Sequence, residues 1–286
     1  MKHNKEFILE YFKDWTSFKI DESMINDGEE TVVGCIDICV STKCNLRCKG
    51  CGSLMPLYNA PKDVPIDLIL ASLDKFFSVV DRVIRVNVVG GEPFLYKDLD
   101  VLIDYLNNNH KVNSVVLPSN GTFAPNNDKL YKLLSHPKNR VRISHYLSCE
   151  KKTDEIQKRF KENNIDYSVK EFSPDSYQWY DFGGYEFRNR TPKELEKQYD
   201  NCAVEWISIY RGKLYPCPRT AHAIDLGLME PNDSFIIDLM KERSREELKT
   251  MIQDYIYGHK YYDCCNHCDR GTGTCTIIPI AEQMSE

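Results

Sequence analysis

Three cysteines lie close together in the stretch "CNLRCKGC". They are Cys44, Cys48 and Cys51, at the spacing C-x3-C-x2-C. Thiolates at this spacing could bind a metal, form a disulfide or have no joint role. An iron–sulfur cubane is normally held by four cysteine thiolates, so three would leave one iron with an open coordination position. An open position distinguishes a catalytic metal site from a structural one. These cysteines are therefore candidate ligands of a cluster that binds a substrate or cofactor directly.

A second group of cysteines lies beyond residue 200. Its members are Cys202, Cys217, Cys264, Cys265, Cys268 and Cys275. Four of these thiolates would saturate a second cluster and favour electron transfer. The same four could instead hold a structural zinc ion. Cys264 and Cys265 are adjacent and cannot be ranked as ligands from the sequence.

Composition narrows the class of protein. The chain has 286 residues, of which 42% are hydrophobic, and a formal net charge of −6. The negative charge argues mildly against a nucleic-acid partner, which usually requires a basic face. No apolar run approaches the ~18 residues of a membrane span, and the first residues lack the apolar core of a signal peptide. We therefore expect a cytoplasmic protein with neither a membrane nor a nucleic-acid partner. Its twelve cysteines would favour metal binding over disulfides in a reducing compartment.

Short segments rich in β-branched residues alternate with helical patterns between residues 33 and 172. The predicted strands are 34–41, 82–90, 114–121, 140–146 and 166–172. In the first long connection, Ile69, Leu73 and Phe77 belong to a stripe of helical periodicity. Alternating strands and helices predict right-handed βαβ units around a parallel sheet, either open or rolled into a barrel. The three clustered cysteines follow the first strand, at the carboxyl edge where α/β folds place active sites.

The alternation stops after residue 172. Residues 173–201 are rich in aromatic residues, glycine and polar residues, which predicts a long connector that is either packed or a substrate lid, with a helix over "PKELEKQY". A hairpin is predicted around Arg211-Gly212, followed by a helix over about 235–257. The expected parts are an N-terminal extension at 1–32, an α/β domain at 33–201 that includes the connector, and a small cysteine-rich domain at 202–286.

The stretch "CNLRCKGC" resembles the signature of the radical S-adenosylmethionine (radical SAM) superfamily, and companion motifs follow in the same order. "VVGGEP" ends the second predicted strand and is similar to the family's Gly-Gly-Glu-Pro motif, which contacts the amino group of the cofactor's methionine. In this interpretation the glycine pair admits that group and Glu92 offers a carboxylate to the ammonium. "SNG" ends the third strand, and Ser144 lies in the fourth. The implied cofactor contacts are Gly90, Gly91, Glu92, Pro93, Ser119, Asn120 and Ser144.

The resemblance implies a fold and a chemistry. The fold is a partial parallel (β/α)6-type barrel. The open iron would bind S-adenosylmethionine, and one electron from a flavodoxin- or ferredoxin-type protein would cleave it. The resulting 5′-deoxyadenosyl radical would abstract a hydrogen atom from an unactivated carbon. This sequence departs from the family at one position, because Gly50 stands where many members have an aromatic residue that packs near the adenine.

The region after residue 201 resembles the opening of the SPASM/twitch extension of many radical SAM enzymes, because Cys202, Gly212 and Cys217 have its spacing. Only Cys275 follows the "CCNHC" stretch, which is more similar to the shorter twitch type. The resemblance implies a small twitch-like domain of a β-hairpin and a helix, with one auxiliary [4Fe–4S] cluster. Its implied ligands are Cys202, Cys217, Cys265 and Cys268, with Cys264 as a possible substitute for Cys265.

Three hypotheses for function follow. The favoured one is an enzyme that epimerises or dehydrogenates a polar small molecule such as a sugar, an aminocyclitol or a nucleotide-linked carbohydrate. The second is an enzyme that modifies peptides, although the residues before the first strand are too few for a separate leader-binding domain. The third is a non-enzymatic iron–sulfur electron carrier or sensor, for which the Gly-Gly-Glu-Pro motif would be superfluous.

Some residues carry weaker signals. Cys149 follows the fourth strand at the expected active-site edge, and it is either a buried small hydrophobe or a catalytic hydrogen donor. Cys35 and Cys39 share one face of the first strand and are expected in the core. Side chains that could bind a polar substrate are Arg211, Arg219 and His222 near Cys217, and the aromatic Tyr177, Trp179 and Tyr180.

Overall fold

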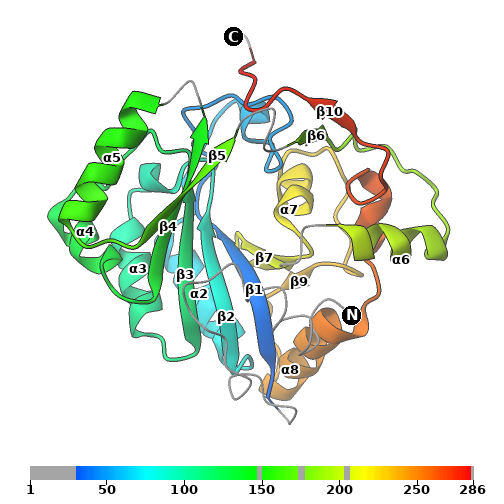
Figure 1. Ribbon diagram of the computed structural model, residues 1–286. Coiled ribbons are helices and arrows are strands. Elements are labelled where there is room, and N and C mark those ends of the chain that lie inside the picture. The colour runs from blue at the N-terminus through cyan, green and yellow to red at the C-terminus, as the bar shows by residue number, and fades with distance from the viewer. Residues whose placement is uncertain (1–29, 147–149, 173–177, 203–206, 285–286) are drawn as a thin grey trace.

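The computed structural model describes residues 30–146, 150–172, 178–202 and 207–284. Its centre is an eight-stranded sheet with the order β5-β4-β3-β2-β1-β7-β8-β9 (Figure 1). The five predicted strands are present, and each runs parallel to its neighbours in the order β1 to β5. Their bounds are β1 Val32–Cys39, β2 Arg82–Val89, β3 Val112–Ser119, β4 Asn139–Tyr146 and β5 Tyr167–Phe172. The predicted α/β fold with a parallel core is confirmed.

A sixth parallel strand comes from the cysteine-rich region. It is β7 (Ile207–Tyr210), which pairs in parallel with β1. The strands β8 (Lys213–Tyr215) and β9 (Ile237–Asp238) continue the sheet in antiparallel fashion. The sixth parallel strand therefore lies beside β1 rather than beyond β5. One sheet therefore contains strands from before and after residue 202. The domain boundary expected at that residue stays a prediction.

Helices connect the parallel strands and bury an apolar stripe. In the first of them, Ile69, Leu73 and Phe77 are buried, as their periodicity predicts. Figure 1 shows α3, α4 and α5 along one outer side of the sheet. The bounds of the connecting helices are α2 Ile66–Phe77, α3 Leu99–Asn108, α4 Asp128–Leu134 and α5 Glu150–Glu162.

The two faces of β1 differ in character. Ile36 and Ile38 belong to the main apolar core. Cys35 and Cys39 are also buried, as expected, although only Cys39 is part of that core. The thiol of Cys35 instead meets the guanidinium of Arg85, whose Nε lies 3.3 Å from Sγ. This face of β1 therefore carries polar groups into the interior of the fold.

The hairpin predicted around Arg211-Gly212 is confirmed, since β7 and β8 pair across these two residues. Both have positive φ, 47° and 79°, as a two-residue hairpin turn of the primed type requires. The long helix predicted over 235–257 is wrong in its first part. Residues 237–238 form β9, and the helix begins only after Ser244, whose hydroxyl caps it by accepting from the Glu247 N–H.

The remaining elements surround the second cysteine group. The predicted connector contains α6 at its predicted place and one strand, β6, that pairs with β10 in a separate two-stranded sheet. The bounds are β6 Trp179–Asp181, α6 Pro192–Asn201, α7 Pro218–Asp225, α8 Arg245–Gln253, β10 Thr276–Ile278, the 3-10 turns η2 Met55–Leu57, η3 Pro93–Leu95 and η6 Asp263–His267, and a π-helical turn at Asp254–Gly258.

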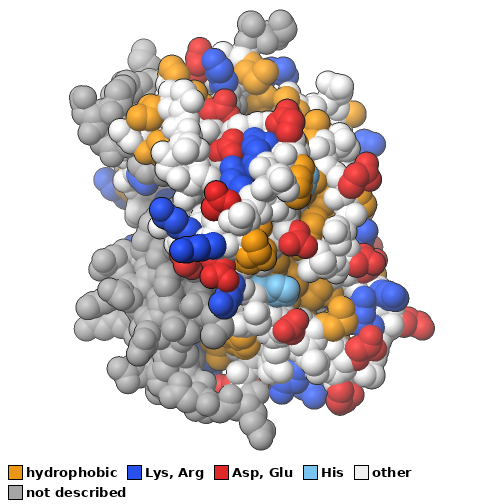
Figure 2. Space-filling view, turned by 90° about the vertical axis from the view of Figure 1, so that its right-hand side faces the viewer, with side chains coloured by type: hydrophobic (Ala, Val, Ile, Leu, Met, Phe, Trp, Pro, Cys, Tyr) orange, Lys and Arg blue, Asp and Glu red, His pale blue; other side chains and the backbone are white. Residues whose placement is uncertain are grey.

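Figure 2 shows the face at the right of Figure 1, where acidic and basic side chains are interspersed. Within the described ranges, the helices are too short or too polar to cross a membrane.

Candidate active site

The three-cysteine loop contacts the end of β2 through backbone hydrogen bonds. The N–H of Gly91 donates to the carbonyl of Ser41 (3.1 Å), and the N–H of Glu92 donates to the carbonyl of Lys43 (2.9 Å). A Cβ on Gly90 would come within 2.8 Å of the Ser41 carbonyl oxygen, and one on Gly91 would overlap the Lys43 carbonyl. Only glycine allows this approach. The glycine pair thus seats the cysteine loop, a role that the sequence did not reveal.

The carboxylate of Glu92 joins the ends of β2 and β3. One oxygen accepts from the Ser119 hydroxyl (2.9 Å) and the Phe94 N–H (3.2 Å), and the other accepts from the Asn120 N–H (2.8 Å). The side chain is fully buried, and burial raises the pKa of Glu92 to about 7 although these donors oppose the shift. The structure therefore brings Glu92, Ser119 and Asn120 together, as their positions on neighbouring strand ends predict.

Asn45 extends this network into the cysteine loop. The Asn120 amide donates to Asn45 Oδ1 (2.9 Å), and the Thr122 hydroxyl donates to the same oxygen (3.2 Å). The Asn120 amide nitrogen also lies 4.0 Å from the sulfur of Cys44. Asn45 was missed by sequence reasoning, and its place directly after the first cysteine is the only signal that pointed to it.

Residues 281–284 pair with the cysteine loop from the far end of the sequence. The Lys49 N–H donates to the Glu282 carbonyl (2.7 Å). The Arg47 N–H donates to Gln283 Oε1 (2.7 Å), and the amide nitrogen of Gln283 lies 3.2 Å from the sulfur of Cys48. No feature of the sequence predicts this pairing.

The three thiols lie close enough to influence one another. Burial raises the pKa of Cys44 to about 12, and the charges of Cys48 and Cys51 act in the same direction. Thiolates crowded in this way bind cations with release of protons. Within the described ranges, no three His, Cys, Asp or Glu side chains converge as a single metal ion would require. Cluster ligands each bind a different iron and need not converge, so this donor set fits an iron–sulfur cluster.

Three candidates from the sequence remain to be placed. Ser144 is on β4, and its hydroxyl hydrogen-bonds to Tyr146 at the end of the same strand. Pro93 begins η3 directly after Glu92. Cys149, the candidate hydrogen donor, lies outside the described residues.

Five cysteines of the second group surround one cavity of about 270 Å³. Cys202 ends α6, and Cys217 caps α7, its sulfur accepting from the Thr220 N–H (3.4 Å). The other three lie in or next to η6. The cavity-lining cysteines are Cys202, Cys217, Cys264, Cys265 and Cys268. The structure thus brings the four expected auxiliary ligands together with Cys264, the possible substitute, which is the most buried of the five.

Backbone contacts hold the loop that carries Cys265 and Cys268. Arg190 Nη1 donates to both of their carbonyls (3.2 and 2.7 Å), and the Gln198 amide does the same (3.1 and 2.7 Å). Asp269 accepts from Arg190 and from Arg188 (2.9 Å). The hydrogen bond from Arg188, followed by that from Arg190, lowers the pKa of Asp269. This double tether fixes the two carbonyls without using either thiol.

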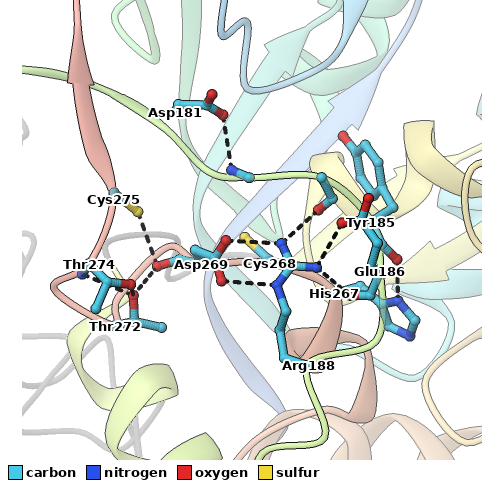
Figure 3. Close-up of polar contacts among 12 residues, drawn as sticks. Asp181, Tyr185, Glu186, Arg188, His267, Cys268, Asp269, Thr272, Thr274 and Cys275 are labelled. Carbon is cyan, nitrogen blue, oxygen red and sulfur yellow. Dashed lines mark hydrogen bonds and ion pairs between the residues drawn. The ribbon is translucent and has the colours of Figure 1, made fainter.

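Figure 3 shows the surroundings of this tether. Arg188 reaches from the connector to Asp269, and Cys275 donates to the carbonyl of Asp269 (3.1 Å). His267 lies 2.6 Å from the carbonyl of Tyr185 through Nδ1. Connector and cysteine-rich tail therefore form one packed unit around the second cysteine group.

Polar side chains of the sheet also line this cavity. They are Asp37, Asn87 and Arg142, from β1, β2 and β4. The Asn87 amide donates to Asp37 Oδ1 (2.8 Å). Arg219 and Arg270 also line the cavity, and their guanidinium carbons lie 5.6 and 4.8 Å from the centroid of the Phe182 ring.

Arg211 and His222, expected beside Cys217, lie in a separate network. Arg211 pairs with Asp225 (2.9 Å), which also accepts from the hydroxyls of Tyr58 and Tyr210 (2.9 Å each). The ring of His222 meets the Tyr58 hydroxyl (2.9 Å), and burial lowers the pKa of His222 to about 4. Of the three basic candidates, only Arg219 lines the cavity. The network ties the segment after the third cysteine to α7.

Comparison with known proteins places the first site in a family. Residues 38–170 match the model of the radical SAM superfamily. A 100-residue segment, 34% of this chain, is 32% identical to a protein of Helicobacter pylori (strain HPAG1) named GTP 3′,8-cyclase. A similar segment is 30% identical to a protein of the same name from Campylobacter curvus (strain 525.92). Each match covers 30% of the relative's length, so this chain spans less than a third of these proteins.

Two solved structures have a related arrangement. BtrN in complex with AdoMet and 2-DOIA is 14% identical, with a TM-score of 0.49 over 84% of this chain and 94% of that chain. Native anSMEcpe with bound AdoMet and Kp18Cys peptide is 14% identical, with a TM-score of 0.46 over 83% and 88%. At this identity neither structure bears on what this chain acts on. The family match spans the three-cysteine loop, Glu92 and the turn at Ser119, and this part of the chain, residues 38–170, belongs to the radical SAM superfamily.

Proposed function

We propose that this radical SAM enzyme abstracts a hydrogen atom from a polar small molecule and thereby epimerises or dehydrogenates it. The substrate class is a sugar, an aminocyclitol or a nucleotide-linked carbohydrate. The observation that carries the proposal is the cavity that Asp37, Asn87 and Arg142 line together with the second cysteine group. Bound S-adenosylmethionine and its reduced cluster supply the hydrogen abstraction.

The lining of this cavity suits a hydroxylated substrate. The Asn87 amide donates to Cys35 and to Asp37, so the Asn87 Oδ1 and the Asp37 carboxylate can act as acceptors for neighbouring hydroxyl groups. Arg142 and Arg219 add donors in fixed fork geometry, which favours an oxygen-rich or anionic group.

The second cysteine group would hold an auxiliary [4Fe–4S] cluster in this proposal. Its ligands are Cys202, Cys217, Cys265 and Cys268, with Cys264 as the substitute for Cys265. Support comes from the shared cavity and from the tether of Arg190 and Gln198 to the loop carbonyls. Saturated ligation suits electron transfer, so this cluster would accept the substrate electron in a dehydrogenation. A flavodoxin- or ferredoxin-type protein would supply electrons to the first site.

The test uses anaerobically reconstituted protein with a strong reductant. Candidate sugars, aminocyclitols and peptides, each deuterated, are screened for deuterium transfer into 5′-deoxyadenosine by mass spectrometry. We expect transfer from a carbohydrate or cyclitol. Transfer from peptides alone would overturn the proposal in favour of peptide modification, and absence of transfer from every class would overturn it too.

A substitution in the cavity sharpens the test. Asp37→Asn removes one charge and one acceptor without changing the shape of the side chain. It should raise KM for the substrate while slow cleavage of S-adenosylmethionine without substrate continues. Asp166→Asn is the matched control, because Asp166 pairs with Arg140 at an exposed position. Equal KM values for Asp37→Asn and wild type would contradict the role of this cavity.

A further inference from the structure

A side chain at the position before the third cysteine would strain the backbone and displace a neighbouring side chain. Gly50 has φ +67°, and a Cβ built there would overlap Cδ1 of Ile278. Ile278 belongs to β10, whose partner β6 places Trp179 opposite it. The small β6–β10 sheet therefore occupies the space that a larger residue at position 50 would fill.

Trp179 brings an aromatic ring to this point instead. Its indole Nε1 donates to the Gly50 carbonyl (3.1 Å). Its ring packs on that of Tyr146, with centroids 5.9 Å apart and planes at 30°, and Tyr146 packs on Phe172 with centroids 5.4 Å apart. Phe172, Tyr146 and Trp179 thus form an aromatic row across the ends of β5 and β4 and the start of β6.

The aromatic row lines a cavity of about 620 Å³. Gly52, next to the third cysteine, lies on its border. Tyr146 is close to the first site as well, because the charges of Cys48, Cys51 and Cys44 add to burial in raising its pKa. Gly271, Thr272 and Gly273 form another part of the wall, and the two glycines carry no side chain that could obstruct a ligand. The cavity thus starts at the cysteine loop and leads along flat apolar rings.

We propose that the aromatic row is the surface on which the adenine of S-adenosylmethionine stacks, with Trp179 as the ring nearest the cysteine loop. A purine has two flat π-faces and gains by stacking on aromatic side chains. The cofactor's methionine end belongs at the three-cysteine loop, so its nucleoside must lie in a space that borders that loop. The inference rests on membership of the radical SAM superfamily and not on the choice of substrate.

The first experiment measures contact directly. The chain has three tryptophans, and Trp15→Phe with Trp206→Phe leaves Trp179 as the sole indole. S-adenosylhomocysteine, 5′-deoxyadenosine and methionine are added in turn to the anaerobically reconstituted protein. We expect the two nucleosides to change the fluorescence of Trp179 and methionine to leave it unchanged. A response to candidate sugars and not to nucleosides would overturn the inference and assign the row to the substrate.

The second experiment measures affinity by equilibrium dialysis. Trp179→Ala should weaken binding of S-adenosylhomocysteine between about fivefold and about 150-fold, the range for loss of one stacking partner. Trp179→Phe should retain most of the affinity, and binding of methionine should not change in either variant. Phe187→Ala is the control, because Phe187 is 60% exposed and lies outside this cavity.

Iron content and circular dichroism confirm that the variants fold. Unchanged affinity for S-adenosylhomocysteine in Trp179→Ala would overturn the inference, as would equal losses for S-adenosylhomocysteine and methionine. Either outcome can occur while deuterium transfer from a carbohydrate persists, so failure of this inference is distinguishable from failure of the proposed function.

Discussion

Replacing Glu92 by glutamine isolates the energetic effect of burying a carboxylate between β2 and β3. Burial raises the pKa of Glu92 from 4.5 to about 7. A carboxyl group whose pKa is higher in the folded than in the unfolded state destabilises the fold as the pH rises. The loss begins near the unfolded value and is complete above the folded value. Each pKa unit corresponds to about 1.4 kcal/mol, so the wild type should lose about 3 kcal/mol between pH 4.5 and pH 8.

The assay is urea unfolding of cluster-free protein, kept reduced and followed by circular dichroism at several pH values. Glu92→Gln cannot titrate, so the free energy of unfolding of wild type minus variant should fall by about 3 kcal/mol across this range. In the variant, the glutamine NH2 group replaces a carboxylate oxygen that accepts hydrogen bonds, so it meets a donor instead of an acceptor. This mismatch lowers the stability of the variant by a similar amount at every pH, so it does not change how the stability difference depends on pH. Glu230→Gln, at an exposed position, corrects for the change in net charge.

Parallel stability curves for wild type and Glu92→Gln would refute the reasoning. An independent check is the infrared band of a protonated carboxyl group, which should persist in the wild type to about pH 7 and be absent from the variant. Loss of this band near pH 4.5 would show that the hydrogen bonds from Ser119, Asn120 and Phe94 fully offset the effect of burial.

Four further predictions concern the cysteines and their surroundings. Reconstituted protein should contain about eight irons and about eight sulfides, because two cubanes are expected. About four irons with one zinc would contradict the auxiliary cluster. Triple replacement by alanine should leave that cluster in place and abolish cleavage of S-adenosylmethionine; the replaced residues are Cys44, Cys48 and Cys51. Gln283→Leu removes the amide next to the Cys48 sulfur and should lower the reduction potential of the first cluster, because a donor at a thiolate favours the reduced state. A redox titration followed by electron paramagnetic resonance measures the reduction potential. An unchanged potential would show that Gln283 does not donate to Cys48 when the cluster is bound. If the reaction is an epimerisation that uses Cys149, Cys149→Ser should form 5′-deoxyadenosine but little inverted product, whereas normal inversion would remove Cys149 as the donor.

The sequence by itself determines the features that depend on local pattern. Alternation of β-branched segments with helical stripes is sufficient to predict β1 to β5 and their parallel order, because each element forms from neighbouring residues. The same reasoning puts the cysteine loop, Glu92 and Ser119 at one sheet edge, since parallel strands share their carboxyl ends. The helix predicted over 235–257 fails in its first part because pairing of Ile237 with Leu214 outweighs helical periodicity.

Tertiary structure alone decides which distant segments complete the site. Gln283 reaches Cys48 across 235 positions, and Trp179 reaches the Gly50 carbonyl across 129. The sixth parallel strand joins the sheet at β1 because β7 finds its partner there, although nothing in its own four residues specifies that edge. Such contacts depend on the packing of whole elements against one another. Residue pattern reports the propensity of a segment and the face that it buries, but not the partner against which that face packs.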